Sequence, residues 1–304
     1  MPISSTVDHV LCHTMSPQDS DILALAIRSS SALGLSDGSY MPKRYPGWAT
    51  SAWFLSDGSA SQSQAFYGVS SVGGPVSAIN AYRAELHGIY SLLVALEFFC
   101  QQKQIDEGGI IIGCDNQGAI HQVQSFHEQV PCATPHADLL RAITTLRLRS
   151  RISLTFRYVP GHQDLFQRFE DLPPLQRLNV WADSLARQEL HRMASLPSLP
   201  IRCHSLLGEK WSAYLETEKI VSDPRIPVLD SLGFTQAQIY WVHHGQLTDQ
   251  SFSLVHWSVL DRAVHAFPHT FQMWLSKFAS GHSAVGITMF RWKNWDSAVC
   301  PVCS

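Results

Sequence analysis

A short and wholly apolar run, Ile110-Ile111-Ile112-Gly113-Cys114, constrains the fold of this chain more than any other stretch. A strand without polar alternation must be covered on both faces, as the central strands of parallel and mixed sheets are. A long segment at about 81–103 precedes it and carries large apolar residues at helical spacing: Ile89, Leu92, Leu96 and Phe99. Together they predict a sheet with helices packed on its faces.

The segments around this pair extend the same pattern. Residues 47–55 and 64–74 are two strand-like stretches joined by a Ser-rich turn, which indicates an antiparallel hairpin. We also expect helices over 117–124, from 134–135 to about 148, and over 180–193, and a half-buried strand over 152–158. With a first strand beside Asp37, this order predicts an α/β fold class, with a mixed five-stranded sheet flanked by helices.

The length of 304 residues predicts about two domains at roughly 150 residues each. With 45% hydrophobic residues, the chain can bury an ordinary core, and long disorder is excluded as the dominant architecture. The Pro- and Ser-rich stretch at 195–200 marks a boundary. We therefore expect an N-terminal leader at 1–32, a folded α/β domain at 33–195 and a mainly helical region at 196–304.

The sequence also indicates the cellular compartment of the protein. No apolar run reaches the roughly 20 residues that a membrane helix needs, so no membrane partner is expected. The first residues lack the basic and apolar regions of a secretory signal. Seven cysteines, odd in number and mostly scattered, favour a reducing environment. We expect an intracellular protein, in the nucleus or the cytoplasm.

Three acidic residues, Glu85, Asp115 and Asp183, occupy positions that ordinary packing does not explain, and Asp37, next to the first strand, is a fourth candidate beside them. Glu85 shares a helical face with apolar residues that should pack on the sheet. Asp115 directly follows the apolar strand, and Asp183 is in line with Ala186 and Leu190. A carboxylate at the rim of a buried face is costly unless it is paired or binds a metal. An all-oxygen ligand set selects Mg²⁺ or Mn²⁺ rather than zinc.

Each acid also has an ordinary explanation when it is taken alone. Asp37 begins a common Asp-Gly turn sequence, and Glu85 is close enough to a helix start to be favoured by the helix dipole. The motif Leu-Ser-Asp-Gly-Ser occurs twice, so Asp57 competes with Asp37 as the first acid. We assign Asp57 to the hairpin turn, because Ser- and Gln-rich residues follow it and only one strand would otherwise precede the helix.

Taken together, these motifs resemble the ribonuclease H domain of bacterial enzymes and of retroelement polyproteins of the non-LTR retrotransposon type. The resemblance covers about 33–194, a little over half of the chain. It rests on five motifs in order: Asp37-Gly-Ser, Arg83-Ala-Glu85-Leu, Asp115-Asn-Gln, Tyr158-Val-Pro-Gly-His162, and Asn179 four residues before Asp183.

The resemblance implies a set of residue roles. Asp37, Glu85, Asp115 and Asp183 would hold two Mg²⁺ ions, which Mn²⁺ can replace, with Asp37 bridging both. His162 would assist proton transfer or product release, with a surface loop histidine as the alternative. An RNA–DNA hybrid would contact Gly38, Ser39, Arg83, Asn116, Gln117 and Asn179. For Arg83, a solvated helix arginine is an equal alternative.

The C-terminal end carries the motif Cys300-Pro-Val-Cys303, which supplies half of a zinc site. It resembles the start of the zinc knuckle that follows ribonuclease H domains in transposon-derived proteins. Because a structural site needs four ligands, we do not expect this chain to bind zinc. The tryptophans of this region are expected to form a helical core, and 271–278 to form an amphipathic helix.

The sequence therefore predicts a metal-dependent endonuclease that cuts the RNA strand of RNA–DNA hybrids. The resemblance also implies a reverse transcriptase region of the same element as a partner. Two alternatives remain open at this point. The first is a catalytically silent nucleic-acid-binding module derived from a retroelement, and the second is another nuclease on the same type of fold. A net charge of −3, from 22 basic and 25 acidic residues, means that nucleic acid must be met through local patches or metal ions.

Overall fold

The computed structural model describes residues 14–17, 19–59, 61–196, 205–209, 211–215, 217–243 and 247–279. The chain forms two compact units, Met1–Asp230 and Ser231–Ser304. Their boundary falls within helix α7 (Arg225–His243), later than the domain end expected near residue 195. The reason is that residues beyond 195, among them Leu206, Lys219 and Val221, pack within the first unit, as shown below.

A mixed sheet forms the centre of the first unit, with the strand order β1-β4-β3-β2-β5-β6. The strands β2 (Ala32–Tyr40), β3 (Ala49–Ser56) and β4 (Phe66–Ser71) form an antiparallel meander. The strands β5 (Gly109–Cys114) and β6 (Ser153–Tyr158) run parallel to β2. The predicted fold class is confirmed, with six strands in place of five, because the short strand β1 (Thr14–Met15) pairs with β4 at the edge.

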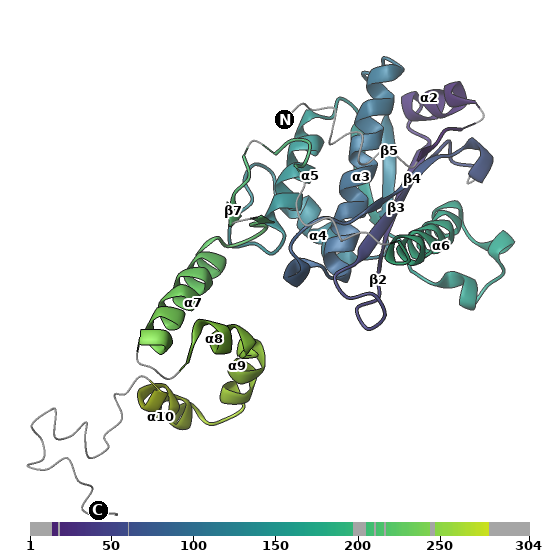
Figure 1. Ribbon diagram of the computed structural model, residues 1–304. Coiled ribbons are helices and arrows are strands. Elements are labelled where there is room, and N and C mark those ends of the chain that lie inside the picture. The colour runs from purple at the N-terminus through teal and green to yellow at the C-terminus, as the bar shows by residue number, and fades with distance from the viewer. Residues whose placement is uncertain are drawn as a thin grey trace, which may run out of the picture. The chain divides into compact units, whose positions relative to one another are not determined.

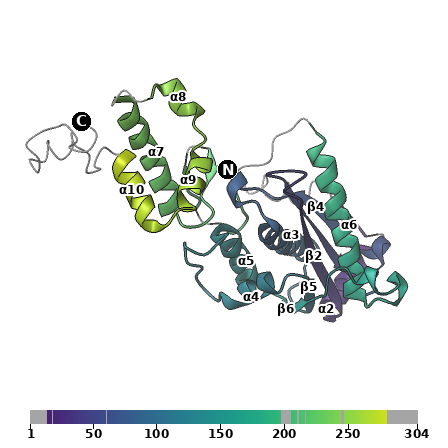
Figure 2. The same cartoon turned by 90° about the horizontal axis from the view of Figure 1, so that it is seen from below.

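Helices cover both faces of this sheet (Figures 1 and 2). On one face lie α3 (Ala81–Gln102), α4 (Gln117–Ser125) and α5 (Ala137–Arg149), and on the other lies α6 (Pro174–Ala194). The apolar run of β5 behaves as its composition predicts, with Ile110 and Ile112 buried in the larger core beneath α3. Leu35, Phe54 and Ala182 belong to the smaller core beneath α6.

The expected leader is partly wrong. Residues Ser20–Arg28 form helix α2, and the side chain of Asp19 caps its N-terminus. Leu23 and Ile27 of this helix are fully buried in the larger core. Six of its nine residues are apolar, but so short a helix gives a periodic signal over only about two turns. A helix of nine residues depends on tertiary packing for its stability, which local sequence does not report.

The last helix of the domain also begins earlier than expected. We expected it from residue 180, but α6 begins at Pro174, with Pro173 as its N-cap. Proline is well suited to the first helical turn, where its missing N–H costs nothing. The two prolines therefore start the helix rather than extend the preceding loop. The loop itself contains two short 3₁₀ turns, η3 (Gln163–Leu165) and η4 (Phe169–Asp171).

The second unit contains α8 (Asp249–Leu254), α9 (Trp257–His265) and α10 (His269–Ala279) after the end of α7. Phe252 is buried there between Phe234 and Trp257, with ring centroids 5.1 and 4.6 Å away. The helical character and the helix expected over 271–278 are confirmed. Cys300 and Cys303 lie outside the described residues, and so does the partial zinc motif. None of the helices in the described ranges is long and apolar enough to cross a membrane.

Candidate active site

The four acidic residues singled out by the sequence come from four elements and meet at one edge of the sheet. Asp37 lies in β2, Glu85 in the second turn of α3, and Asp115 directly after β5. The parallel pairing of β2 and β5 ends at Leu35 opposite Gly113, so Asp37 and Asp115 both lie two residues beyond it. Asp183, on α6, is close enough to raise the pKa of both aspartates by Coulomb repulsion.

Burial and mutual repulsion make this cluster electrostatically unfavourable. Asp37 is 4% exposed and Glu85 is 8% exposed. Burial raises the pKa of both carboxyl groups well above the usual range, and the charge of Asp115 raises each pKa further. Burial also raises the pKa of Asp115. A group of carboxylates in this state is stabilised either by protons or by a cation.

Two glycines allow the acidic residues to approach each other. A Cβ atom on Gly38 would lie 2.7 Å from the backbone nitrogen of Glu85, so only glycine lets β2 pack this closely on α3. A Cβ atom on Gly161 would lie 2.6 Å from Oδ2 of Asp115. Gly161 was expected only as part of the motif before His162. The structure shows that its missing side chain makes room for the carboxylate.

Asp183 differs from the other three acids because it forms an ion pair with an arginine. Arg187, one turn later on α6, places Nη2 at 2.7 and 2.8 Å from its two carboxylate oxygens. Nδ1 of His162 lies 4.0 Å from Oδ2 of Asp183, and the His162 side chain is well exposed. His162 also acts on Asp115, whose pKa it lowers. The expected loop histidine therefore lies beside Asp183 and Asp115, with its side chain largely exposed.

Two further residues, which the sequence analysis did not assign to the acid cluster, also contact it. Cys114 donates a weak hydrogen bond from Sγ to Oε2 of Glu85 at 3.6 Å. Asn179 is buried and hydrogen-bonds to Asp115, while its Oδ1 atom has no hydrogen-bond partner among the described residues. The signal for Cys114 was its place in the buried strand, next to Asp115. Asn179 was expected to contact substrate rather than an acid.

The residues expected to bind a hybrid divide into accessible and buried ones. Gln117 is exposed, and Gly38 and Asn116 are half-buried. The Asn116 side chain also caps α4 by accepting a hydrogen bond from the Ala119 nitrogen at 2.9 Å. Ser39 is buried, so a duplex would not reach its side chain without a change in structure.

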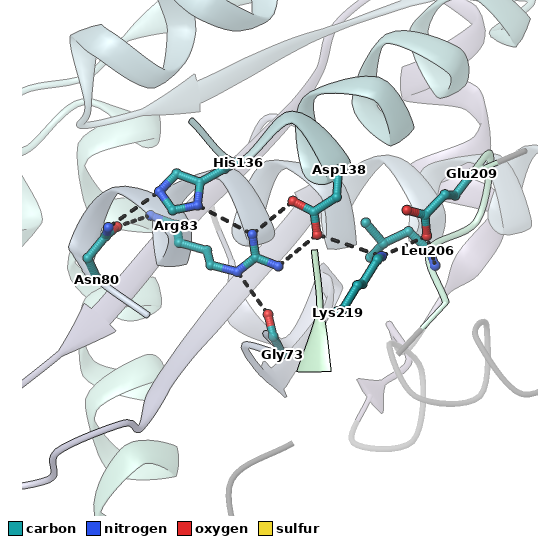
Figure 3. Close-up of polar contacts among 8 residues, drawn as sticks. All are labelled: Gly73, Asn80, Arg83, His136, Asp138, Leu206, Glu209 and Lys219. Carbon is teal, nitrogen blue, oxygen red and sulfur yellow. Dashed lines mark hydrogen bonds and ion pairs between the residues drawn. The ribbon is translucent and has the colours of Figure 1, made fainter. Parts of the chain in front are cut away.

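Arg83 is a correction to the expected set, because it is 1% exposed. Its guanidinium group forms a bidentate ion pair with Asp138 at 2.8 and 2.9 Å and donates to the Gly73 carbonyl at 2.8 Å (Figure 3). Asp138 lies 55 residues later in the sequence, and nothing in the local motif indicates it. Arg83 is a structural residue and is not available to substrate.

The choice of Asp37 over Asp57 agrees with the geometry. Asp57 lies after β3, and its Oδ1 accepts hydrogen bonds from the backbone and side chain of Ser59 at 3.0 and 2.6 Å. These are the contacts of a turn-forming aspartate. Asp37 carries the contacts with the other acids.

The donor set suits a hard divalent cation. Ligand atoms of Glu85, Cys114 and Asp115 lie within 4.8 Å of one another. Burial raises the pKa of the Cys114 thiol well above its usual value, so the sulfur stays protonated and is a poor ligand. The carboxylates and the amide oxygen of Asn179 remain, and oxygen ligands of this kind favour Mg²⁺, Mn²⁺ or Ca²⁺.

No protein-family model matches the chain, and no curated protein matches its sequence. Among solved structures, it is similar to LC11 ribonuclease H1, isolated from compost and solved in complex with an RNA/DNA hybrid. That match has 14% identity and a TM-score of 0.38, and covers 54% of this chain and 99% of that one. Ribonuclease H1 of the archaeon Halobacterium salinarum matches at 18% identity, 53% and 98% coverage, and a TM-score of 0.34.

The foamy viral protease–reverse transcriptase, solved in complex with an RNA/DNA hybrid, matches at 16% identity and a TM-score of 0.36. The match covers 55% of this chain and 21% of the viral one. Similarity at this level carries no information about activity, which has to be inferred from the site itself.

Proposed function

We propose that this protein is a divalent-metal-dependent nuclease that hydrolyses the RNA strand of RNA–DNA hybrids. The observation that carries the proposal is the convergence of Asp37, Glu85, Asp115 and Asp183 at one edge of the sheet. Among the described residues, no basic side chain forms an ion pair with Asp37 or Glu85, the two most deeply buried acids of the set. A site with excess negative charge and an accessible side is suited to recruiting cations and then a polyanion.

The four carboxylates would hold Mg²⁺, with Mn²⁺ as a substitute. When bound, a pair of such ions activates a water molecule and stabilises the leaving oxygen in phosphodiester hydrolysis. The need for the cation follows from the burial of Asp37 and Glu85. Without it, their negative charges persist only at a cost in free energy.

The residues around the acids support this chemistry by orienting and proton handling. Asn179 holds Asp115 by a hydrogen bond, and the absence of a side chain at Gly161 leaves room for that carboxylate. His162 is exposed and adjacent to Asp183, where it would assist proton transfer or product release. Arg187 fixes the Asp183 carboxylate through two contacts.

The choice of substrate is supported by groups at the edge of the site and by the sequence motifs. The amide of Gln117 is exposed at the start of α4, close in sequence to Asp115, and Gly38 follows Asp37 in β2. Amide and backbone groups of this kind can contact 2′-hydroxyls in the shallow minor groove of RNA-containing duplexes. The retroelement origin and a reverse transcriptase partner rest on the motif resemblance and belong to the same proposal.

The test is a cleavage assay with labelled RNA–DNA hybrid, RNA duplex and DNA duplex, in Mg²⁺, Mn²⁺ or EDTA. We expect metal-dependent cutting of the RNA strand in the hybrid alone. Hybrid binding without cleavage in either metal would instead favour a silent binding module. Cleavage of duplex DNA but not of the hybrid would favour a different nuclease.

A further inference from the structure

A second group of buried charges lies near the N-terminus of α3, on the side of the helix opposite Glu85. It is centred on Arg83 and Asp138. It is completed by two residues from a segment beyond the expected catalytic domain, Lys219 and Glu209. Figure 3 shows the chain of contacts: Arg83 to Asp138, Asp138 to Lys219, and Lys219 to Glu209. The last two ion pairs measure 3.6 and 2.7 Å. All four side chains are at least nine-tenths buried.

The segment that supplies Lys219 and Glu209 consists of the described residues 205–209, 211–215 and 217–221, which include the short strands β7 (Tyr214–Leu215) and β8 (Glu218–Lys219), paired with each other. We call it the clasp segment. It is joined to the domain by more than charge. Leu206 belongs to the larger core, the Leu207 nitrogen donates to the Tyr90 hydroxyl at 2.7 Å, and Val221 is buried with its carbonyl accepting from the Asp138 nitrogen.

The ion pairs reach the first turn of α3 directly. Asn80, the N-cap of α3, accepts a hydrogen bond from the Arg83 nitrogen at 2.8 Å. The ring of His136 contacts both the Asn80 amide and the Arg83 guanidinium, at 3.3 and 3.4 Å. Arg83 also donates to the Gly73 carbonyl. The start of α3 is therefore fixed from the side of the clasp segment by several directional contacts.

The opposite side of the same turn carries the candidate site. Gly38 of β2 packs against the backbone of Ala84 and Glu85 so closely that no side chain would fit. The backbone of Glu85 is thus held between β2 on one side and the Arg83 contacts on the other. Loss of one of these supports would let the first turns of α3 shift, and Glu85 with them.

We propose that the clasp segment is a positioning element of the candidate active site, in which Lys219 and Glu209 act through Asp138 and Arg83 to fix Glu85. The role in metal binding rests on the function proposed above, whereas the effect on α3 itself does not. Lys219 and Glu209 touch neither the acids nor a substrate, so they are positioning residues and not catalytic ones.

The test uses the full chain and the variant Lys219→Met, which leaves two buried carboxylates without their shared cation. Lys219→Arg restores the charge. Lys103→Met is the matched control, because it removes a lysine from an exposed ion pair with Asp21 at the other end of α3. If Lys219→Met does not fold, the variant Glu209→Gln/Lys219→Met replaces it, since it removes one charge of each sign.

The first measurement is hydrogen exchange of the metal-free protein, well below its melting temperature. We expect Lys219→Met to speed exchange at residues 84–88 of α3 at least tenfold, with 93–101 of the same helix unchanged. Lys219→Arg and Lys103→Met should match the wild type. Equal exchange in the folded variant and the wild type at 84–88 would overturn the proposal, whether or not the protein cleaves hybrids.

The second measurement is the Mg²⁺ concentration at which half of the metal-induced rise in melting temperature is reached. We expect Lys219→Met to raise this midpoint about fivefold or more, and to lower kcat for the hybrid without changing KM. A faster exchange at 84–88 with an unchanged Mg²⁺ midpoint would reduce the clasp segment to a structural support. A wild type that binds Mg²⁺ but cleaves nothing would sink the proposed function and leave this inference standing.

Discussion

Two groups of buried charges lie on either side of the same turn of α3, and they differ in balance. Around Arg83, two basic and two acidic side chains alternate in one chain of contacts. Around Glu85, carboxylates gather from four elements, and burial and repulsion raise the pKa values of Asp37, Glu85 and Asp115. Burial alone therefore does not identify a functional residue. In the structural group every charged side chain has a partner of opposite sign, whereas Asp37 and Glu85 of the candidate site form no ion pair among the described residues.

The largest effect on stability should come from breaking the balanced group. Asp138→Asn leaves Arg83 and Lys219 in the core with Glu209 as the remaining anion. Removing one partner of a buried pair typically costs about 3–5 kcal/mol, because it leaves an uncompensated charge. Urea unfolding of the wild type and the variant at pH 7 measures this loss. A change below about 1 kcal/mol would show that solvent reaches this group and that the balance is unimportant.

Lowering the pH should reduce the stability of the folded protein through protonation of His136, which contacts the balanced group. The ring faces Arg83 and Asp138, the Asn80 amide and the Tyr82 ring, and burial first, then the charge of Arg83, lowers its pKa from 6.5 to about 4. The unfolded chain thus binds a proton that the folded chain rejects. The resulting stability is present above about pH 6.5 and is lost as pH falls through 4, a difference of roughly 3 kcal/mol.

The variant His136→Asn isolates this effect. His136 adopts a left-handed backbone conformation with φ of 56°, which asparagine tolerates better than most residues. We expect the stability of the variant to fall less between pH 6.5 and 4 than that of the wild type, as measured by unfolding at a series of pH values. Parallel curves for the two proteins would show that His136 is not the group responsible.

Removing one charge from the acid cluster should stabilise the metal-free protein, whereas removing one from the balanced group destabilises it. Asp37→Asn relieves the repulsion by Asp115 and Asp183 and removes a buried anion, so it should stabilise the protein in EDTA by about 1 kcal/mol. The same variant should gain less stability from Mg²⁺ than the wild type does. Thermal melting with and without Mg²⁺ measures both. A destabilised variant in EDTA would mean that Asp37 is held by contacts that outweigh the repulsion.

The smallest effect is expected at an exposed ion pair. Arg151 and Asp106 lie 2.8 Å apart, with side chains 73% and 69% exposed. Exposed pairs of this kind typically contribute about 0–1 kcal/mol, because water screens them. Asp106→Asn should therefore leave the unfolding free energy nearly unchanged. A loss as large as that of Asp138→Asn would contradict the distinction between buried and exposed pairs.

The same comparison shows what the sequence can predict here. Three of the acids were found because each stands where an apolar or neutral residue is expected, at the end of a buried strand or on an apolar helix face. Asp37 was found through its Asp-Gly-Ser motif. The role of Arg83 was missed because its partners Asp138 and Lys219 are far away in the sequence and carry no local signal. The contribution of 205–221 was missed for the same reason, since two-residue strands have no periodicity to detect.

The helices and strands also divide into those that local sequence patterns indicated and those that they did not. The order of the main helices and strands followed from periodicity, and the buried strand of isoleucines was recognised from composition. Helix α2 and strand β1 depend on packing against distant elements, so local patterns did not indicate them. The start of α6 was misplaced because Pro173 and Pro174 can end one segment or begin another, and only the neighbouring core decides between them.

The most direct test of the account is cleavage of a labelled RNA–DNA hybrid by the wild type and by Asp115→Asn, in Mg²⁺ and in EDTA. We expect the wild type to cut the RNA strand in Mg²⁺ and not in EDTA. We also expect that Asp115→Asn, although folded, falls by at least about 100-fold, because a metal-dependent step loses one of its ligands. Cleavage that persists in EDTA, or that survives in the variant, would contradict the claim that the uncompensated acids form a metal-dependent nuclease site.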